Sequence, residues 1–178
     1  MKKIVFIFAL LTLSKYSFAQ TNNTQSYTDS INTLYRIQGR LDTLKKFYTA
    51  KNIVFDSILN IGLYSTAYDW IGTPYRYSGS SKKGIDCSGF TKNVYKEVYC
   101  KELQGGSADL YTISTLIEKK NLKEGDLIFF KIKKGRISHV GVYLRNNKFV
   151  HASVKGGVMI NDLDEAYYKK YFFKGGRL

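Results

Sequence analysis

The chain has 178 residues, of which 44% are hydrophobic and 24% charged, and it carries a formal net charge of +14 at pH 7. This length suits one domain with a targeting segment, and an aromatic content of 15% with a single proline argues against disorder. The positive charge indicates an anionic partner, but the lysines are scattered and form no basic helix, which argues against nucleic acid.

The first 19 residues have the order of a secretory signal peptide. Lys2 and Lys3 precede an apolar run at positions 4–13, and Ala19 provides a small residue before a cleavage site ahead of Gln20. The run is too short to span a bilayer as a stable helix, so we expect no stable membrane insertion. We therefore predict export, either to the periplasm or to the medium.

Helical patterns dominate the chain before residue 100. Residues 20–30 are polar, and we expect them to be flexible. Apolar residues recur near helical spacing over 31–48, where Asp29 or Ser30 can cap the start. The spacing recurs over 53–71, where a Gly-Thr-Pro sequence stops it.

The second half of the chain has the pattern of a small sheet. We expect a short helix near 112–119, followed by five short apolar segments with the composition of strands. Helices followed by an antiparallel sheet make an α+β domain, which we place at residues 53–178 after a short N-terminal segment at 20–52. The predicted strands are residues 127–131, 139–145, 148–153, 157–161 and 171–175.

The two cysteines, Cys87 and Cys100, are separated by a third helical pattern. Phe90, Val94 and Tyr95 fall on one face of that helix. A helix with a rise of about 1.5 Å per residue would hold the two cysteines roughly 20 Å apart, whereas a disulfide needs Cα atoms within about 7 Å. Export permits disulfides, but we predict that these thiols are unpaired and that Cys100 is a buried apolar residue.

Cys87 has the setting of a reactive cysteine. It follows a glycine-containing loop at 75–86 and begins the predicted helix. The partial positive charge at a helix N-terminus lowers the pKa of a thiol. The polar neighbours Asp86 and Ser88 are unlike a core segment, although either residue can simply cap the helix.

The two histidines lie on neighbouring predicted strands. A two-residue turn would place His139 and His151 on opposite faces of the sheet, because side chains alternate along a strand. A three-residue connection at 145–147 would instead place His151 opposite Gly141 and on the same face as His139. The two Cα atoms would then be about 7–8 Å apart, so that the imidazoles can meet. A functional pair therefore requires an odd loop or a bulge here.

Cys87, His139 and His151 can supply the three parts of amide hydrolysis by a thiol. The thiolate attacks a carbonyl, a neighbouring imidazole transfers the proton, and a third polar group orients that imidazole. The backbone amide of Cys87 can stabilise the oxyanion. A zinc site is the competing interpretation. Because the three residues have no short pairwise spacing, we predict neither a metal nor another cofactor.

Five segments that contain these residues resemble, in order and spacing, the NlpC family of papain-like cell-wall cysteine peptidases. The resemblance covers roughly residues 55–178 and implies a helical half with the nucleophile, packed on a small antiparallel sheet with the histidines. The segments are GTPY at 72–75, DCSGF at 86–90, EGDLIFF at 124–130, SHVGVYL at 138–144 and FVHAS at 149–153.

The resemblance also implies an activity. Members hydrolyse amide bonds in peptidoglycan stem peptides, typically between γ-D-glutamate and a diamino acid. In this chain Cys87 would be the nucleophile, His139 the base and His151 the residue that orients the base. An amidase or acyltransferase of the same fold is an alternative, as is a non-catalytic wall-binding relative.

The family pattern implies further contacts around the nucleophile. Residues matching Tyr75, Asp86 and Ser88 contact the substrate, and the tyrosine can also assist the oxyanion. Two departures lie at the rim of the cleft. Ser78 replaces the first glycine of a Tyr-x-x-Gly-Gly pattern, and the segment LQGGS at 103–107 lacks the usual proline and arginine. These departures concern fine specificity and leave the three catalytic positions unchanged.

Overall fold

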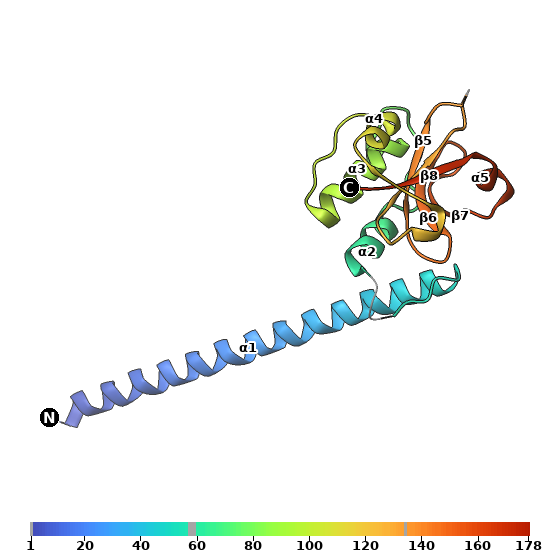
Figure 1. Cartoon of the computed structure of the whole chain (residues 1–178). Helices are drawn as coiled ribbons and strands as arrows, with labels where there is room; N and C mark the ends of the chain where they lie inside the picture. The colour runs from blue at the N-terminus through green and yellow to red at the C-terminus, as the bar shows by residue number, and fades with distance from the viewer. Residues whose placement is uncertain (1, 57–59, 134) are drawn as a thin grey trace. The chain divides into compact units, whose positions relative to one another are not determined.

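The computed structural model describes residues 2–56, 60–133 and 135–178, with side chains described from residue 25 onward (Figure 1). The chain forms two compact units, Met1–Lys46 and Phe47–Leu178. The predicted signal peptide at 1–19 lies outside the residues whose side chains are described, so it stays a prediction, as do the predicted domain limits. Within the described residues, no helix combines the length and apolar content needed to cross a membrane.

Helix α1 (Lys2–Thr49) includes the polar segment that we expected to be flexible. That expectation, and the predicted helix start at Asp29 or Ser30, are wrong. The polar side chains are satisfied one turn away within the helix: the Ser30 hydroxyl donates to the Ser26 carbonyl at 2.8 Å, and the Gln25 amide donates to Asp29 at 3.2 Å. Such i,i+4 contacts let a polar sequence remain helical.

Helix α2 (Ile61–Trp70) is shorter than the pattern predicted over 53–71. Asn60 caps its start by accepting a hydrogen bond from the Leu63 N–H at 3.1 Å. Of the residues predicted to precede it in the helix, 53–56 are not helical and 57–59 lie outside the described residues. The helix is fixed to the end of α1 by the Tyr48 hydroxyl, which donates to the Tyr64 carbonyl at 2.7 Å.

The helix that begins with the candidate nucleophile is confirmed as α3 (Cys87–Tyr99). The loop before it contains a short hairpin of β1 (Ser80–Ser81) and β2 (Gly84–Ile85). Both cysteines are free, which confirms that they are unpaired. Cys100, however, is exposed at the left-handed C-cap of α3 (φ 54°), so our expectation of a buried residue is wrong.

The predicted sheet is confirmed as six antiparallel strands in the order β3-β8-β4-β5-β6-β7. The helix expected near 112–119 lies earlier, as α4 (Ser107–Thr112), because the Asp109 carboxylate accepts from the Gly106 N–H at 2.7 Å and caps that turn. The remaining elements are β3 (Thr115–Ile117), η1 (Lys119–Asn121), β4 (Leu127–Phe130), β5 (His139–Tyr143), β6 (Lys148–Ser153), β7 (Gly157–Asp162), α5 (Ala166–Tyr171) and β8 (Phe172–Arg177).

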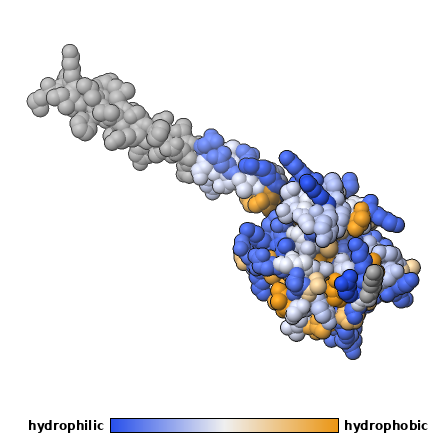
Figure 2. All heavy atoms as spheres, turned by 90° about the horizontal axis from the view of Figure 1, so that it is seen from above, coloured by the Kyte–Doolittle hydropathy of each residue, from blue (hydrophilic) through white to orange (hydrophobic). Residues whose placement is uncertain are grey.

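Helices cover both faces of this sheet (Figure 1). The Phe129 ring contacts Tyr111 of α4 at 5.3 Å between centroids, whereas the neighbouring Phe130 ring contacts Tyr168 of α5 at 5.7 Å. Val140 pairs with Phe129 and His139 pairs with Phe130. Because directly paired residues share a face, His139 lies on the α5 face. The outer surface is mainly hydrophilic in the view of Figure 2, with small apolar patches.

The hairpin between β5 and β6 has the three-residue connection that a histidine pair requires. Val142 pairs with Val150, and the Leu144 N–H donates to the Lys148 carbonyl at 2.9 Å. Asn146 and Asn147 both adopt positive φ, at 53° and 59°, which asparagine tolerates better than most residues. The register prediction is therefore confirmed.

Candidate active site

The start of α3 is held by a network around Asp86. One carboxylate oxygen accepts from the Gly89 N–H at 2.7 Å and from the Ser88 hydroxyl at 2.9 Å. The other oxygen accepts from the Ser78 N–H at 2.9 Å. Asp86 is thus the N-cap of the helix, and Ser88 supports it. This network fixes the backbone on both sides of Cys87.

The Cys87 sulfur lies near the backbone of Val140, at the start of β5. The side chain is 8% exposed, and the backbone N–H groups of Val140, Ser88 and Cys87 itself act to lower the pKa of its thiol. Because the N–H of Leu144 points towards β6, the two-residue period of the strand directs the Val140 N–H the same way. The β5–β6 pairing ends at Val142, so this N–H is available to the sulfur.

Burial, rather than the helix terminus, dominates the pKa of Cys87. Removal from water raises the pKa of the thiol, and the carboxylate of Asp86 raises it further. The three backbone N–H groups oppose this by stabilising the thiolate. The N–H groups at the start of α3 do lower the pKa of Cys87, as predicted, but burial outweighs them and the net shift is upward. The sulfur rests as a thiol until a base removes its proton.

The two histidines are in direct contact on the α5 face of the sheet. His139 Nε2 and His151 Nδ1 are 2.7 Å apart, and both side chains are buried. Gly141 makes this possible, because a Cβ at that position would lie only 3.1 Å from His151 Cβ. Burial lowers the pKa of His151 to about 4, and burial with the neighbouring His151 ring lowers the pKa of His139 well below its ordinary value. Both rings are therefore neutral at pH 7.

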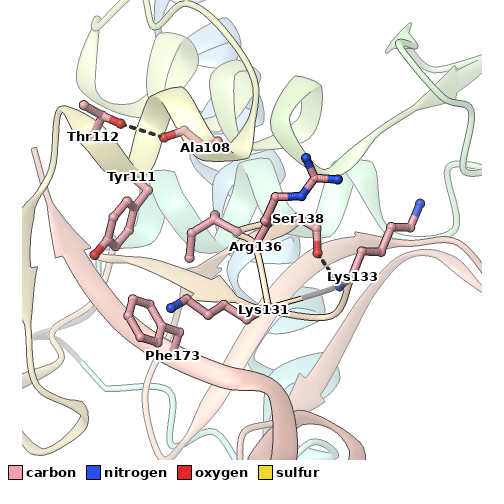
Figure 3. Close-up of a pocket in the computed structure, with 10 residues that line it drawn as sticks. Ala108, Tyr111, Thr112, Lys131, Lys133, Arg136, Ser138 and Phe173 are labelled. Atoms are coloured by element: carbon pink, nitrogen blue, oxygen red, sulfur yellow. Dashed lines mark hydrogen bonds between the residues drawn. The ribbon is translucent and has the colours of Figure 1, made fainter.

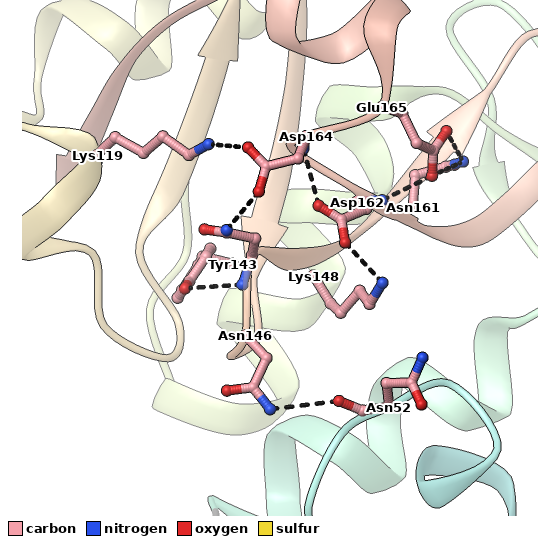
Figure 4. Close-up of polar contacts among 10 residues, drawn as sticks. Asn52, Lys119, Tyr143, Asn146, Lys148, Asn161, Asp162, Asp164 and Glu165 are labelled. Atoms are coloured by element: carbon pink, nitrogen blue, oxygen red, sulfur yellow. Dashed lines mark hydrogen bonds and ion pairs between the residues drawn. The ribbon is translucent and has the colours of Figure 1, made fainter.

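Asn161 and Glu165 continue the chain of hydrogen bonds behind His151, and Figure 4 shows the contact between Asn161 and Glu165. The Asn161 Nδ2 group donates to both oxygens of Glu165, at 3.1 and 3.0 Å, so Asn161 Oδ1 faces His151 Nε2 at 2.9 Å. An amide oxygen only accepts, so His151 carries its proton on Nε2 and accepts on Nδ1. His139 must then donate from Nε2, which leaves the lone pair of its Nδ1 free to accept a proton.

His151, which we predicted as the third catalytic residue, is supported by residues that the sequence pattern did not single out. The Tyr168 hydroxyl lies 3.2 Å from His151 Nε2 and donates to Asn161 Oδ1 at 3.3 Å. The Phe149 ring packs beside His151 at 4.8 Å between centroids. The signal that could have revealed Asn161 is a polar side chain on strand β7 opposite buried Phe149.

Tyr75 lies near Cys87 and Asp86. Its backbone bridges to Ile85, immediately before the cap residue Asp86. Partial burial raises the pKa of the Tyr75 hydroxyl, and the nearby Cys87 and Asp86 groups raise it further. The phenol is thus held in its protonated form, in which it can donate a hydrogen bond.

A cavity of about 400 Å³ lies beside the histidines. Its lining includes both imidazoles together with Ser153, Lys155 and Tyr167. The volume falls in the range of small-molecule sites in proteins. A ligand in this cavity would reach the His139–His151 pair directly.

This arrangement matches a known family of proteins. The sequence model of the NlpC/P60 family matches residues 72–177, which is more than half of the chain. The chain belongs to the NlpC/P60 family. It is 31% identical over 185 residues to the "Probable endopeptidase NlpC homolog" of Haemophilus influenzae, covering 100% of this chain and 99% of that protein.

Other relatives carry related names. The chain is 42% identical over 125 residues to the "Probable endopeptidase NlpC" of Escherichia coli K12, covering 69% of this chain and 81% of the relative. It is 41% identical over 111 residues to the "Murein DD-endopeptidase MepS/Murein LD-carboxypeptidase" of the same organism, covering 62% of this chain and 58% of the relative.

Solved structures show the same fold. An NlpC/P60 family protein from Bacillus cereus has a TM-score of 0.62 at 30% identity, over 66% of this chain and 39% of the other chain. The NlpC/p60 domain of the peptidoglycan hydrolase SagA has a TM-score of 0.58 at 28% identity, over 67% of this chain and 98% of the other chain. The α+β NlpC/P60 fold is thus established for this chain.

Proposed function

We propose that this chain is an exported peptidoglycan endopeptidase that hydrolyses amide bonds of stem peptides with Cys87 as the nucleophile. Relatives at 31–42% identity are named as endopeptidases, and one of them as a murein endopeptidase. The observation that carries the mechanism is the hydrogen-bond chain from Glu165 to His139, which leaves a proton acceptor on the residue next to Val140, whose backbone N–H acts on the Cys87 thiol. The N-terminal segment supports export.

The proposed reaction starts from a neutral pair. The thiol of Cys87 and the imidazole of His139 are both buried, and burial disfavours the charged form of each. Substrate binding therefore precedes proton transfer. His139 Nδ1 accepts the thiol proton as the sulfur attacks the carbonyl, and the N–H of Val140 stabilises the developing thiolate.

The later steps use the groups around the same sulfur. In this proposal, the backbone N–H at the start of α3 and the protonated hydroxyl of Tyr75 stabilise the oxyanion of the tetrahedral intermediate. The imidazolium of His139 then protonates the leaving amine, and His151 stabilises it through the 2.7 Å contact. Water hydrolyses the thioester with His139 as the base, which restores the thiol.

The assigned roles of Asp86 and Ser88 are narrower than the family pattern implies. Both oxygens of Asp86 accept hydrogen bonds from the protein, and the Ser88 hydroxyl donates to one of them. We propose that these residues support substrate binding mainly by fixing the loop and the helix start around Cys87. Tyr75 is the residue of this set that is free to contact the substrate through its side chain.

The test uses purified protein and isolated murein. The wild-type chain should release stem-peptide fragments, and Cys87→Ala should abolish release. Cys100→Ala is the matched control, because this thiol is exposed and lies at the other end of α3, so activity should remain. Hydrolysis that survives in Cys87→Ala would exclude the mechanism.

The position of the cut is a separate question that the same digest answers. The resemblance favours the bond between γ-D-glutamate and a diamino acid. The name of the 41% identical relative instead specifies a DD-endopeptidase and LD-carboxypeptidase. Mass spectrometry of the fragments separates these outcomes, because the first cut leaves the acidic residue at a new C-terminus and the others do not. Loss of an acyl group without chain cleavage would indicate an acyltransferase.

A further inference from the structure

A second cavity lies next to Ser138, on the other side of the backbone from the cavity beside His139. Its volume is about 580 Å³, and it is formed by α4, the hairpin between β4 and β5, and β8 (Figure 3). Ser138 lines this cavity, and the next residue, His139, lines the cavity beside the histidine pair. A substrate that binds across the active site therefore has a pocket on each side of the general base.

The second cavity is strongly basic. Its lining contains Lys131, Lys133 and Arg136, and none of the described residues that line it is acidic. Four described lysines elsewhere form ion pairs, and among them Lys119 pairs with Asp164 at 2.6 Å and Lys148 with Asp162 at 2.7 Å. Among the ion pairs of the described residues, none involves a cation of this cavity. Their positive charge is thus available to a ligand.

The hairpin places two of these cationic residues at directly opposed backbone positions. Lys133 and Arg136 are directly opposed in an antiparallel bridge, and the Arg136 N–H donates to the Lys133 carbonyl at 3.0 Å. Like charges at directly opposed positions destabilise a β pair. The Ser138 hydroxyl accepts from the N–H groups of Ile132 and Lys133, at 3.2 and 3.1 Å, and braces the turn. An anion bound near the two side chains would reduce this repulsion.

The third cation is positioned by aromatic rings instead of by a carboxylate. The Lys131 ammonium lies 3.5 Å from the centroid of the Phe173 ring (Figure 3). Tyr111 flanks the same ring at 5.9 Å and packs on Phe129 at 5.3 Å. A cation–π contact orients the ammonium without neutralising it. The aromatic wall also offers an apolar surface to the body of a ligand.

We propose that this cavity, lined by Lys131, Lys133, Arg136, Tyr111 and Phe173, is a subsite for a free carboxylate of the stem peptide. The inference rests on the proposed function. A γ-linked acidic residue keeps its α-carboxylate free, and that carboxylate lies within a few bonds of the scissile amide. Arginine and lysine bind carboxylates through charge-assisted hydrogen bonds. The subsite would select stems with free acids over stems in which those acids are amidated.

The test measures binding without turnover, using the full chain with Cys87→Ala. Calorimetry compares a stem peptide with free carboxylates and the same peptide with amidated carboxylates. The variant Lys131→Met with Arg136→Met removes two charges but keeps the aliphatic stems. It should bind the free acid at least about tenfold more weakly, since charge-assisted hydrogen bonds contribute more than the equivalent of a tenfold change. Its binding of the amidated peptide should be unchanged.

The matched control is Lys45→Ala with Lys46→Ala, which removes the same net charge from two exposed positions of α1. It should bind both peptides like the parent chain. Equal weakening by the control, equal weakening for both peptides, or preference for a phosphate-bearing wall polymer over the free-acid peptide would overturn the subsite. If the wild-type chain fails to cleave murein while the cavity variant still loses free-acid binding, the proposed activity fails and the subsite stands.

Discussion

The buried histidine pair makes the stability of the second unit depend on pH. Burial lowers the pKa of His151 from 6.5 to about 4, and the pKa of His139 is lowered well below its ordinary value by burial and the neighbouring ring. Between pH 6.5 and about pH 4, the unfolded chain therefore binds more protons than the folded chain. The stability due to the pair is therefore fully present above pH 6.5 and is lost as the pH falls towards 4.

The size of the loss follows from the two pKa values of His151. Linkage gives about 2 kcal/mol of lost unfolding free energy between pH 7 and pH 5, and about 3 kcal/mol by pH 4. His139 adds a loss of the same sign. Most carboxylates are still ionised at pH 5, and the chain has two histidines in total. The interval from pH 7 to pH 5 thus reports on this pair.

Urea unfolding followed by tryptophan fluorescence measures the effect. The single tryptophan, Trp70, is buried in α2 and lies 6.3 Å from the Phe90 ring, so its emission reports on the second unit. The double variant His139→Gln with His151→Asn should lose less than about 0.5 kcal/mol over the same interval, because no group remains to titrate. An equal loss in the double variant, or a wild-type chain equally stable at pH 7 and pH 5, would refute the reasoning.

Three further predictions concern single side chains. Gly141→Ala places a Cβ 3.0 Å from the Val150 carbonyl and 3.1 Å from His151 Cβ, so kcat should fall about 10- to 100-fold in a murein assay. Gly39→Ala, which meets nothing within 4 Å, is the control, and an unchanged kcat in Gly141→Ala would contradict the packing argument. Asn161→Leu should lower kcat about tenfold at constant KM, because the tautomer of His151 is no longer fixed. Glu165→Gln keeps a hydrogen-bonding oxygen and should therefore retain more activity than Glu165→Leu. Equal losses in the two Glu165 variants would argue against this role. Ser78 has a φ of 55°, so Ser78→Gly should raise the unfolding free energy by about 0.5–1 kcal/mol in urea, whereas Ser78→Ala should not; a gain in both would show that the backbone conformation is not the cause.

Local patterns were sufficient for the elements that carry the site. The spacing of Phe90, Val94 and Tyr95 identified α3, whose buried face contains these three residues. The sequence failed where contacts distant in the chain decide the outcome. The helix predicted over 53–71 begins only at Ile61, because the Asn60 cap and the contact of Tyr64 with Tyr48 define its start.

The sequence alone determined that a helix begins at Cys87 and that His139 and His151 share a face if their strands are joined by three residues. Both follow from short-range periodicity, in which the side-chain direction repeats every few residues. Only the tertiary structure decided that the thiol is buried and its pKa raised, and that Asn161 and Glu165 set the proton positions of the histidines. Burial and hydrogen-bond direction depend on which strands and helices come together, and short-range patterns do not contain that information.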